Sequence, residues 1–141
     1  MNTDIEEIKM DIKAKKAVED LVEINQITDR IIGCGFKISN SLGGGFLEKV
    51  YENALAHELV KCGLRCAQQH SITVWYDGIV VGDFLADIVV EDRVLIELKS
   101  VRALNNLHFA QCINYLKATR LKVCLLMNFG NPKMEFKRII N

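Results

Sequence analysis

The stretch from residue 71 to residue 99 constrains the fold most, because it holds two chain reversals between segments rich in strand-forming residues. Asp77-Gly78 separates SITVWY from IVVGDFLADIVV, and an Asp-Gly pair between two such segments is a strong β-hairpin signal. A second reversal near Asp92 leads into VLIELK. These patterns predict three consecutive antiparallel strands.

Helical patterns lie on both sides of these strands. Residues 4–24 carry a rough helical stripe of apolar side chains, a second helix is expected from Thr28 to Leu42, and a third from the glycines at 43–45 to Gly63. A polar helix over residues 105–119, the buried strand LKVCLLMNF and an edge strand over 133–140 complete the chain. The order predicts an α/β protein. The first helix either docks on a partner or packs on its own domain.

Length and charge exclude several classes of protein. The chain has 141 residues, half of them apolar, which suits one domain with a sizeable core. Its 18 basic and 18 acidic side chains balance, so any contact with DNA must be local rather than driven by an overall field. The N-terminus lacks a secretory pattern and no apolar run could span a bilayer. We expect a cytoplasmic protein without a membrane segment.

The cysteines, histidines and glycines indicate no resident cofactor other than a metal ion. The five cysteines form no Cys-x-x-Cys pair, so buried free thiols are expected rather than an iron–sulfur cluster. The three histidines share no ligand spacing that would suit zinc. The glycines at 43–45 are not followed by Gly-Lys-Ser or Gly-Lys-Thr, so no nucleotide-binding loop and no organic cofactor is expected.

Three charged side chains of the second hairpin form the main candidate site. If the reversal is centred on Asp92, Asp87 faces Glu97 across the two strands. Because side chains alternate along a strand, these two carboxylates and Lys99 then project from one surface, opposite an apolar face. A reversal centred half a residue later would place the carboxylates on opposite faces.

The spacing of Asp87 and Glu97 favours a metal ion. Carboxylates on directly opposed residues, about 4.5–5.5 Å apart at Cβ, repel each other unless a proton or cation relieves them. Hard oxygen ligands suit Mg²⁺ or Mn²⁺, which retain waters and accept phosphate oxygens. Lys99 could then orient or deprotonate an attacking water. The alternative is an exposed charged hairpin in which Lys99 forms an ordinary ion pair.

Two helical patterns add candidates to this site. Glu48 shares a face with Tyr51 and the leucines that follow it, so a partly buried carboxylate is expected, serving as a metal ligand or as a helix cap. Gln111 and Tyr115 are neighbours on one face of the polar helix. They either contact phosphate, water or a metal-bound carboxylate, or attach the helix to the sheet.

An ordered set of motifs carries a resemblance to a known family. The set consists of Gly45-x-x-Glu48-x-x-Tyr51, Asp87, Glu97-Leu98-Lys99, Gln111-x-x-x-Tyr115 and Asn128-Phe129. It resembles the GxxExxY family, small prokaryotic proteins placed in the PD-(D/E)xK nuclease superfamily, from about residue 26 onward. The resemblance implies a restriction-endonuclease-like mixed β-sheet flanked by helices. It divides the chain into an N-terminal helical extension, residues 1–25, and a nuclease-like domain, residues 26–141.

The resemblance also implies which residues act. The implied catalytic residues are Glu48, Asp87, Glu97, Lys99, Gln111 and Tyr115, and the implied metal ligands are Asp87, Glu97, Glu48 and the backbone carbonyl of Leu98. Three positions depart from the family pattern: Leu85 replaces a usual arginine, Ala86 a proline and Ser39 a frequent histidine. Losing those groups could weaken phosphate binding without removing the metal site.

The implied activity is hydrolysis of DNA phosphodiester bonds by water activated at Mg²⁺ or Mn²⁺. One or two ions act, depending on whether Glu48 reaches the other carboxylates. The alternative is a non-catalytic nucleic-acid-binding or protein-assembly module with a nuclease fold, which the balanced charge and the three departures favour. Because a small nuclease has little surface with which to hold a duplex, a homodimer is considered as well.

Overall fold

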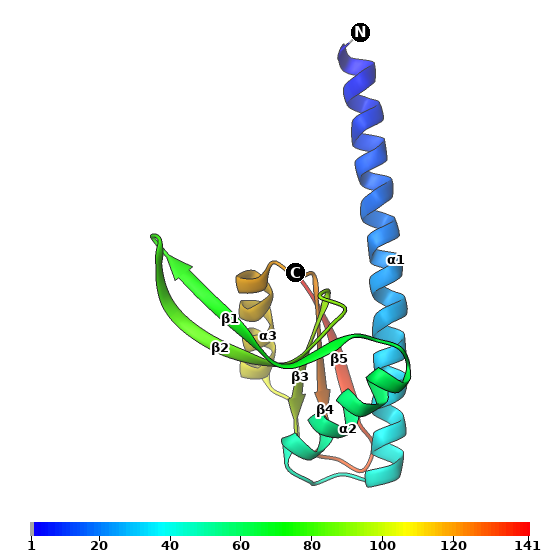
Figure 1. Cartoon of the computed structure of the whole chain (residues 1–141), viewed down its shortest axis with the longest axis vertical. Helices are drawn as coiled ribbons and strands as arrows, with labels where there is room; N and C mark the ends of the chain where they lie inside the picture. Colours follow the sequence, from blue (N-terminus) through cyan, green and yellow to red (C-terminus); the bar gives the residue numbers. More distant parts are fainter. Residues whose placement is uncertain (1) are drawn as a thin grey trace.

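The computed structural model describes residues 2–141, which form a mixed five-stranded sheet with helices on both faces (Figure 1). The helices are α1 (Asn2–Leu42), α2 (Glu48–Lys61) and α3 (Asn106–Thr119), and the strands are β1 (Cys66–Tyr76), β2 (Ile79–Val90), β3 (Val94–Lys99), β4 (Val123–Asn128) and β5 (Glu135–Ile140). The strands lie in the order β1-β2-β3-β4-β5. β3 and β4 are parallel, and the other neighbours are antiparallel. The expected α/β class with a mixed sheet is confirmed.

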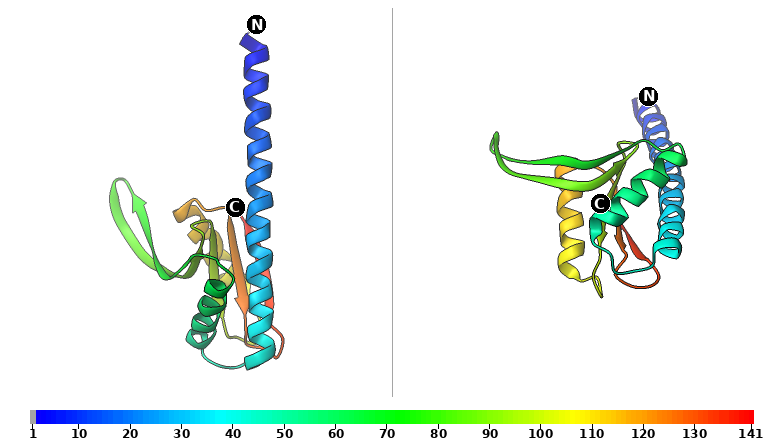
Figure 2. Two further views of the ribbon diagram at one scale, coloured as in Figure 1. Left: turned by 45° about the vertical axis from the view of Figure 1, so that its right-hand side comes forward. Right: turned by 60° about the horizontal axis from the view of Figure 1, so that its bottom comes forward.

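Helices α1 and α2 cover one face of the sheet and α3 covers the other (Figure 1 and Figure 2). Alternate side chains of β3 show this arrangement, because Val94 and Ile96 pack with α1 and α2, whereas Leu95 packs with α3. Since the middle of the sheet is covered on both faces, every residue of β4 is buried. The central strands therefore form a rigid support for side chains at their ends.

α1 is one continuous helix of 41 residues, so the expected pair of separate helices is wrong. The connecting residues, Asn25 to Ile27, contain neither glycine nor proline, and nothing there ends a helix. Residues 4–23 are exposed apart from half-buried Asp20, and burial begins at Ile24. The first half of α1 thus extends beyond the sheet (Figure 1). Despite this length, no helix in residues 2–141 is apolar enough to cross a membrane.

Both chain reversals have the geometry that the sequence predicts. Asp77 and Gly78 have positive φ angles of 49° and 76°, as a type I′ turn requires at its two central residues. Strands β2 and β3 pair with Ile88 opposite Ile96, which is the register of a reversal centred on Asp92. The alternating pattern and the turn residues therefore predicted the strand pairing that positions the candidate site.

The cysteines only partly follow the sequence prediction. All five are free thiols, and Cys34, Cys112 and Cys124 are buried. Cys66 is half-buried and Cys62 is exposed, so the expected burial is wrong for Cys62. Cys62 caps the C-terminal end of α2, where the chain leaves the covered face of the sheet.

Candidate metal centre

Asp87 and Glu97 lie where β2 begins to separate from β3. The backbone pairing of the two strands ends with Ile88 opposite Ile96. Beyond this pair, the backbone N–H of Asp87 donates to Glu97 Oε1 at 3.2 Å, and the backbone N–H of Leu98 donates to Asp87 Oδ2 at 2.7 Å. Each carboxylate thus accepts a hydrogen bond from the backbone of the opposite strand. The two acids lie together, as the hairpin register predicts.

The alternation of side chains along β2 breaks at Asp87. Ile88 packs on the α1 and α2 side of the sheet, whereas Ala86, two residues earlier, packs on the α3 side. The adjacent strand is distorted at the same level, because Gln69 of β1 has a φ of 53°, in the left-handed region. The outer parts of β1 and β2 therefore form a projecting hairpin, residues 70–86, which we call the arm (Figure 2).

Burial disfavours the charged form of both carboxylates. Glu97 is 4% exposed, and its burial, together with the nearby charge of Asp87, raises the pKa of Glu97 to about 8. Burial also raises the pKa of Asp87, against the lowering effect of the Leu98 amide. The amine of Lys99 favours the charged form of both acids but does not offset their burial. At neutral pH this pair requires a proton or a cation.

Lys99 is half-buried at the end of β3. No acidic side chain in the described part of the chain forms an ion pair with it, so the ordinary surface ion pair considered for this lysine is absent there. Its amine remains available to a ligand beside the carboxylates.

Glu48 begins α2 and is exposed, so its expected partly buried position is wrong. The same helix buries Tyr51 and the leucines that follow it, but its first turn projects past them. Leu47 holds the cap position, with no side-chain hydrogen bond, so Glu48 complements the helix dipole from the first turn rather than as the cap. Burial is the main cause of the raised pKa of Asp87, and the negative charges of Glu52 and Glu48 raise it further. Both acids therefore lie near the centre.

Glu52 is the buried acid of α2, and the sequence reasoning missed it. Glu52 is 3% exposed and accepts hydrogen bonds from the Nε2 atoms of Gln68 at 2.7 Å and Gln69 at 2.6 Å. Lys49 pairs with the same carboxylate at 3.0 Å. Its position three residues before buried Leu55 is the helical signal that could have found it. These contacts hold α2 against β1, next to Asp87.

Helix α3 brings Gln111 and Tyr115 to the other side of the centre. Gln111 Nε2 donates to the hydroxyl of Tyr115 at 2.9 Å, so the two share one face of the helix as their spacing predicts. Burial raises the pKa of Tyr115, the bond from Gln111 lowers it, and the charges of Glu97 and Asp87 raise it further. Tyr115 is therefore within electrostatic reach of the carboxylates, although it is bonded to neither in the described residues.

Tyr51 of the Gly-x-x-Glu-x-x-Tyr motif binds backbone groups of the loop before α2. The hydroxyl of Tyr51 donates to the carbonyl of Gly43 at 2.7 Å and accepts from the N–H of Phe46 at 3.1 Å. Its ring stacks on Phe129, with centroids 4.5 Å apart and planes at 9°. The N–H of Gly45 also donates to the carbonyl of Phe129 at 3.2 Å. Tyr51 and Phe129 thus fix the loop from which Glu48 emerges.

Asn128 fixes the loop that follows Lys99. Its Oδ1 accepts from the N–H groups of Val101 and Gly130, each at 3.0 Å, and its Nδ2 donates to the carbonyl of Val101 at 2.9 Å. Asn128 is fully buried, so this loop is held rigidly. The Asn-Phe pair at the end of β4 therefore supports both loops that border the centre.

The three departures from the family pattern have different structural settings. Ser39 is buried, and its Oγ accepts from the N–H of Met134 at 2.9 Å, so it stabilises the chain before β5. Leu85 is 56% exposed on the arm, whereas Ala86 is fully buried. Of these three positions, only Leu85 exposes its side chain to solvent, and it lies two residues before Asp87 in the sequence.

The hydrogen bonds at this centre bring two carboxylates together. In residues 2–141 there is no group of three or more Asp, Glu, His or Cys side chains arranged to hold a metal ion, so the arrangement that would favour two ions is absent there. Asp87 and Glu97 each use one oxygen for a backbone amide. The other oxygen of each acid has no hydrogen-bond donor among those residues. Two carboxylates alone would suit an ion that keeps several waters.

Comparison with known families gives one match over most of the chain. The family model described as the PD-(D/E)XK nuclease superfamily matches residues 25–139. The match includes all the candidate site residues and begins close to the first buried residue of α1. No curated protein matches the sequence significantly.

Comparison with solved structures gives a partial match. It is the crystal structure of an alkaline exonuclease from Laribacter hongkongensis, with 15% sequence identity and a TM-score of 0.40. The similarity covers 66% of this chain and 55% of the exonuclease. The chain therefore corresponds to about half the length of that protein.

Proposed function

Since the chain belongs to the PD-(D/E)XK nuclease superfamily, we propose that it hydrolyses phosphodiester bonds of DNA with the help of a divalent metal ion. Its mixed sheet flanked by helices is a restriction-endonuclease-like fold. The observation that carries the proposal is the pair of half-buried Asp87 and buried Glu97, in which each acid leaves one oxygen without a protein donor in the described residues. Such a pair is costly to keep charged unless a cation binds.

The proposal gives each residue at the centre a role. Asp87, Glu97 and the backbone carbonyl of Leu98 would hold Mg²⁺ or Mn²⁺, with exposed Glu48 at the edge of the same site. Such an ion supplies charge neutralisation at the phosphoryl oxygens and an acidified water. Lys99, free of ion pairs in the described residues, would orient the attacking water.

Gln111 and Tyr115 complete the proposed site from α3. Their mutual hydrogen bond fixes the orientation of the Tyr115 hydroxyl, which lies within electrostatic reach of both acids. A tyrosine held in this way can donate to a phosphate oxygen. The pair would therefore position the substrate rather than bind the metal.

Within the superfamily, we assign the chain to the GxxExxY group. The motif residues have structural reasons to occur together, since Tyr51 and Phe129 stack and jointly hold the loop before Glu48. Asn128 holds the loop after Lys99. These contacts support an assignment that the family match itself leaves at the level of the superfamily.

The experiment combines metal binding with cleavage. We expect calorimetric titration to show Mn²⁺ binding to the wild-type protein, and expect cleavage of some form of DNA in Mg²⁺ or Mn²⁺. Asp87→Asn and Glu97→Gln should abolish both and preserve the circular dichroism spectrum. Asp11→Asn and Glu19→Gln make the same chemical changes on the exposed half of α1 and should change neither. Absence of Mn²⁺ binding at millimolar metal would overturn the proposal, and faster cleavage of RNA would correct its substrate.

A second candidate function is a non-catalytic assembly module, and the exposed first half of α1 favours it. Ile5, Ile8 and Ile12 lie on this segment and are each more than half exposed, so α1 could join a partner or a second copy of the chain. Analytical ultracentrifugation of the full chain tests the homodimer directly. A monomer that binds Mn²⁺ and cleaves DNA would exclude the assembly function as the sole activity.

A further inference from the structure

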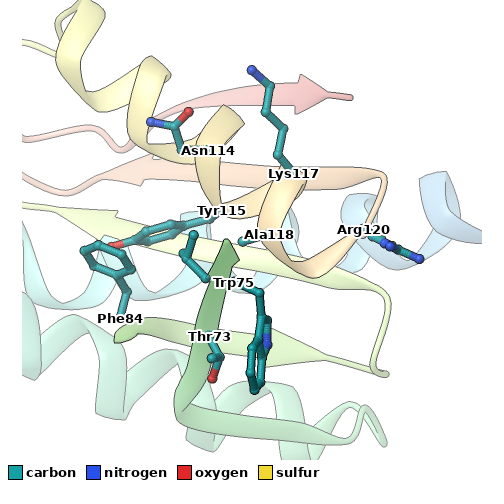
Figure 3. Close-up of a pocket in the computed structure, with 9 residues that line it drawn as sticks. Thr73, Trp75, Phe84, Asn114, Tyr115, Lys117, Ala118 and Arg120 are labelled. Atoms are coloured by element: carbon teal, nitrogen blue, oxygen red, sulfur yellow. The ribbon is translucent and has the colours of Figure 1, made fainter. Parts of the chain in front are cut away.

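A groove runs between the arm and α3, beside the carboxylate centre. Its volume is about 570 Å³, and its lining comes from β1, β2, the second half of α3 and the residue that ends α3. Figure 3 shows Phe84 and Tyr115 facing each other near one end, Arg120 at the other end, and Trp75 projecting from β1 between them. We call this feature the arm groove.

Aromatic rings in the arm groove are open to solvent. Trp75 is 64% exposed and Phe84 is 46% exposed, and the ring of Phe84 lies 5.7 Å from that of Tyr115. Exposed aromatic rings in a groove offer faces on which unpaired nucleobases stack. Bases inside a duplex already stack on each other and would not reach these rings.

The α3 side of the groove supplies positive charge. Lys117 and Arg120 line it, and neither forms an ion pair in residues 2–141. Asp83 on the arm is the acid nearest to the lining along the chain, and it accepts a hydrogen bond from Thr73 at 3.1 Å. The lining of the groove thus holds two cations and no acid, although Arg120 also borders a second pocket with Asp20 and Asp92. On a chain without net charge, such a lining suits a phosphate backbone.

The conformation of Arg120 is a further observation. Its φ is 61°, the left-handed conformation that ends α3. Glycine or asparagine adopts this conformation with less strain than arginine. The arginine therefore gives no backbone advantage at this position. Its charge is favoured by the dipole at the C-terminal end of α3 and is also available to the groove that Arg120 lines.

Tyr115 links the arm groove to the candidate metal centre. Tyr115 lines the groove, and the same residue responds to the charges of Glu97 and Asp87. Its hydroxyl is held by Gln111 at the boundary between the two. A chain of nucleotides lying in the groove would therefore pass Tyr115 on its way to the carboxylates.

We infer that the arm groove binds single-stranded nucleic acid, with Trp75 and Phe84 stacking on bases and Lys117 and Arg120 pairing with phosphates. The inference rests on the proposed nuclease function for the identity of the ligand. It makes the substrate a strand that is unpaired where it enters the centre, such as a frayed end, a flap or a single strand. The binding itself requires neither metal nor hydrolysis.

The single tryptophan of the chain, Trp75, permits a direct test. The full-length wild-type protein in EDTA and low salt is titrated with oligothymidine of about 12 nucleotides, within the length that such binding surfaces cover. We expect saturable quenching of Trp75 fluorescence, and weaker quenching by a duplex of equal length. Because EDTA prevents hydrolysis, this result is independent of whether the protein cleaves DNA.

Variants distinguish base stacking from phosphate contacts. For each variant, the fluorescence anisotropy of a labelled oligothymidine gives the Kd. Trp75→Ala should raise the Kd about tenfold, within the range of one lost base stack. Lys117→Gln combined with Arg120→Gly should lower the slope of log Kd against log salt by about 1.4, the value for two phosphate contacts on a single strand. Glycine suits the backbone of residue 120, so misfolding would not explain the loss. The matched control Lys13→Gln with Lys137→Gly removes two exposed cations elsewhere and should leave the slope unchanged.

Three outcomes would overturn the inference. They are an absence of Trp75 quenching by the oligonucleotide, tighter binding of the duplex than of the single strand, and wild-type affinity in both groove variants. In the absence of DNA, Trp75 fluorescence could instead change with protein concentration, and Trp75→Ala could dissociate a dimer. These two results together would show that the arm is an interface between copies of the chain. Groove binding with no cleavage in Mn²⁺ would contradict the proposed function and leave this inference standing.

Discussion

The backbone N–H of Asp87 donates to the side-chain oxygen Oε1 of Glu97 at 3.2 Å. This bond favours the charged form of Glu97, but it does not offset burial, because the pKa of Glu97 is still raised. The cost of the charged form follows from burial, since Glu97 is 4% exposed. A cation bound at the proposed metal centre would relieve this cost.

The first prediction concerns pH in the metal-free protein. The pKa of Glu97 is raised from an ordinary 4.5 to about 8 by burial and then by the charge of Asp87. The folded state therefore retains a proton that the unfolded state loses, so stability falls as pH rises from about 4.5 to about 8. Relative to Glu97→Gln, the wild type should lose on the order of 4 kcal/mol across this window. Urea denaturation in EDTA at a series of pH values measures the difference.

Glu19→Gln provides the control for this pH series, because Glu19 is exposed on α1. Its unfolding free energy should follow that of the wild type at every pH. Identical pH profiles for the wild type and Glu97→Gln would show that Glu97 is not the buried titrating group.

The second prediction separates the two acids of α2. Glu52→Ala should lower the unfolding free energy by about 2–3 kcal/mol, because it removes the buried acceptor of Gln68 and Gln69. Glu48→Ala should change it by less than about 0.5 kcal/mol, since Glu48 is exposed. Chemical denaturation measures both. Equal losses in the two variants would contradict the distinction between a structural acid, Glu52, and an exposed acid, Glu48, at the edge of the proposed metal site.

The hairpin could be predicted from the sequence because its determinants are local. Asp77-Gly78 specifies a turn with two positive φ angles, and the alternating residues around Asp92 allow one register that buries the apolar side chains. The opposition of Asp87 and Glu97 follows from that register. The break in alternation at Asp87 could not be predicted, because it depends on how the arm packs against α3.

The helices show where local patterns fail. The apolar stripe of α2 is buried as the pattern predicts. The pattern does not reveal that the first turn of α2 projects beyond the packed layer. The prediction of Glu48 as the buried acid is therefore wrong. The charged, amphipathic start of α1 likewise predicts a helix but not where its packing begins. The arm groove was missed because Trp75 and Lys117 are far apart in sequence and meet only through the sheet and α3.

The third prediction tests whether the exposed start of the N-terminal extension contributes to the folded domain. Removing residues 2–18 should leave the unfolding free energy within about 0.5 kcal/mol of the wild type, because the side chains of residues 4–18 are exposed. The shortened chain keeps Asp20 and Glu23, which pair with Arg93. Ile31→Ala removes a fully buried side chain of the same helix and should cost about 2–5 kcal/mol. A comparable loss on truncation would show that the extension contributes to the folded domain.

The last prediction compares two glycines within one helix. Gly33 and Gly35 both lie inside α1, where replacing glycine with alanine normally stabilises a helix by about 1 kcal/mol. A Cβ on Gly33 meets no atom within 4 Å, so Gly33→Ala should give that gain. A Cβ on Gly35 would overlap the side chain of Met127 and lie 2.6 Å from the sulfur of Met134. Gly35→Ala must displace the flexible but buried ends of these two side chains, so it should stabilise the protein by about 1 kcal/mol less than Gly33→Ala, or destabilise it. A lower thermal midpoint for Gly35→Ala than for Gly33→Ala would show that Gly35 permits the close approach of α1, whereas equal gains would contradict the tight contact.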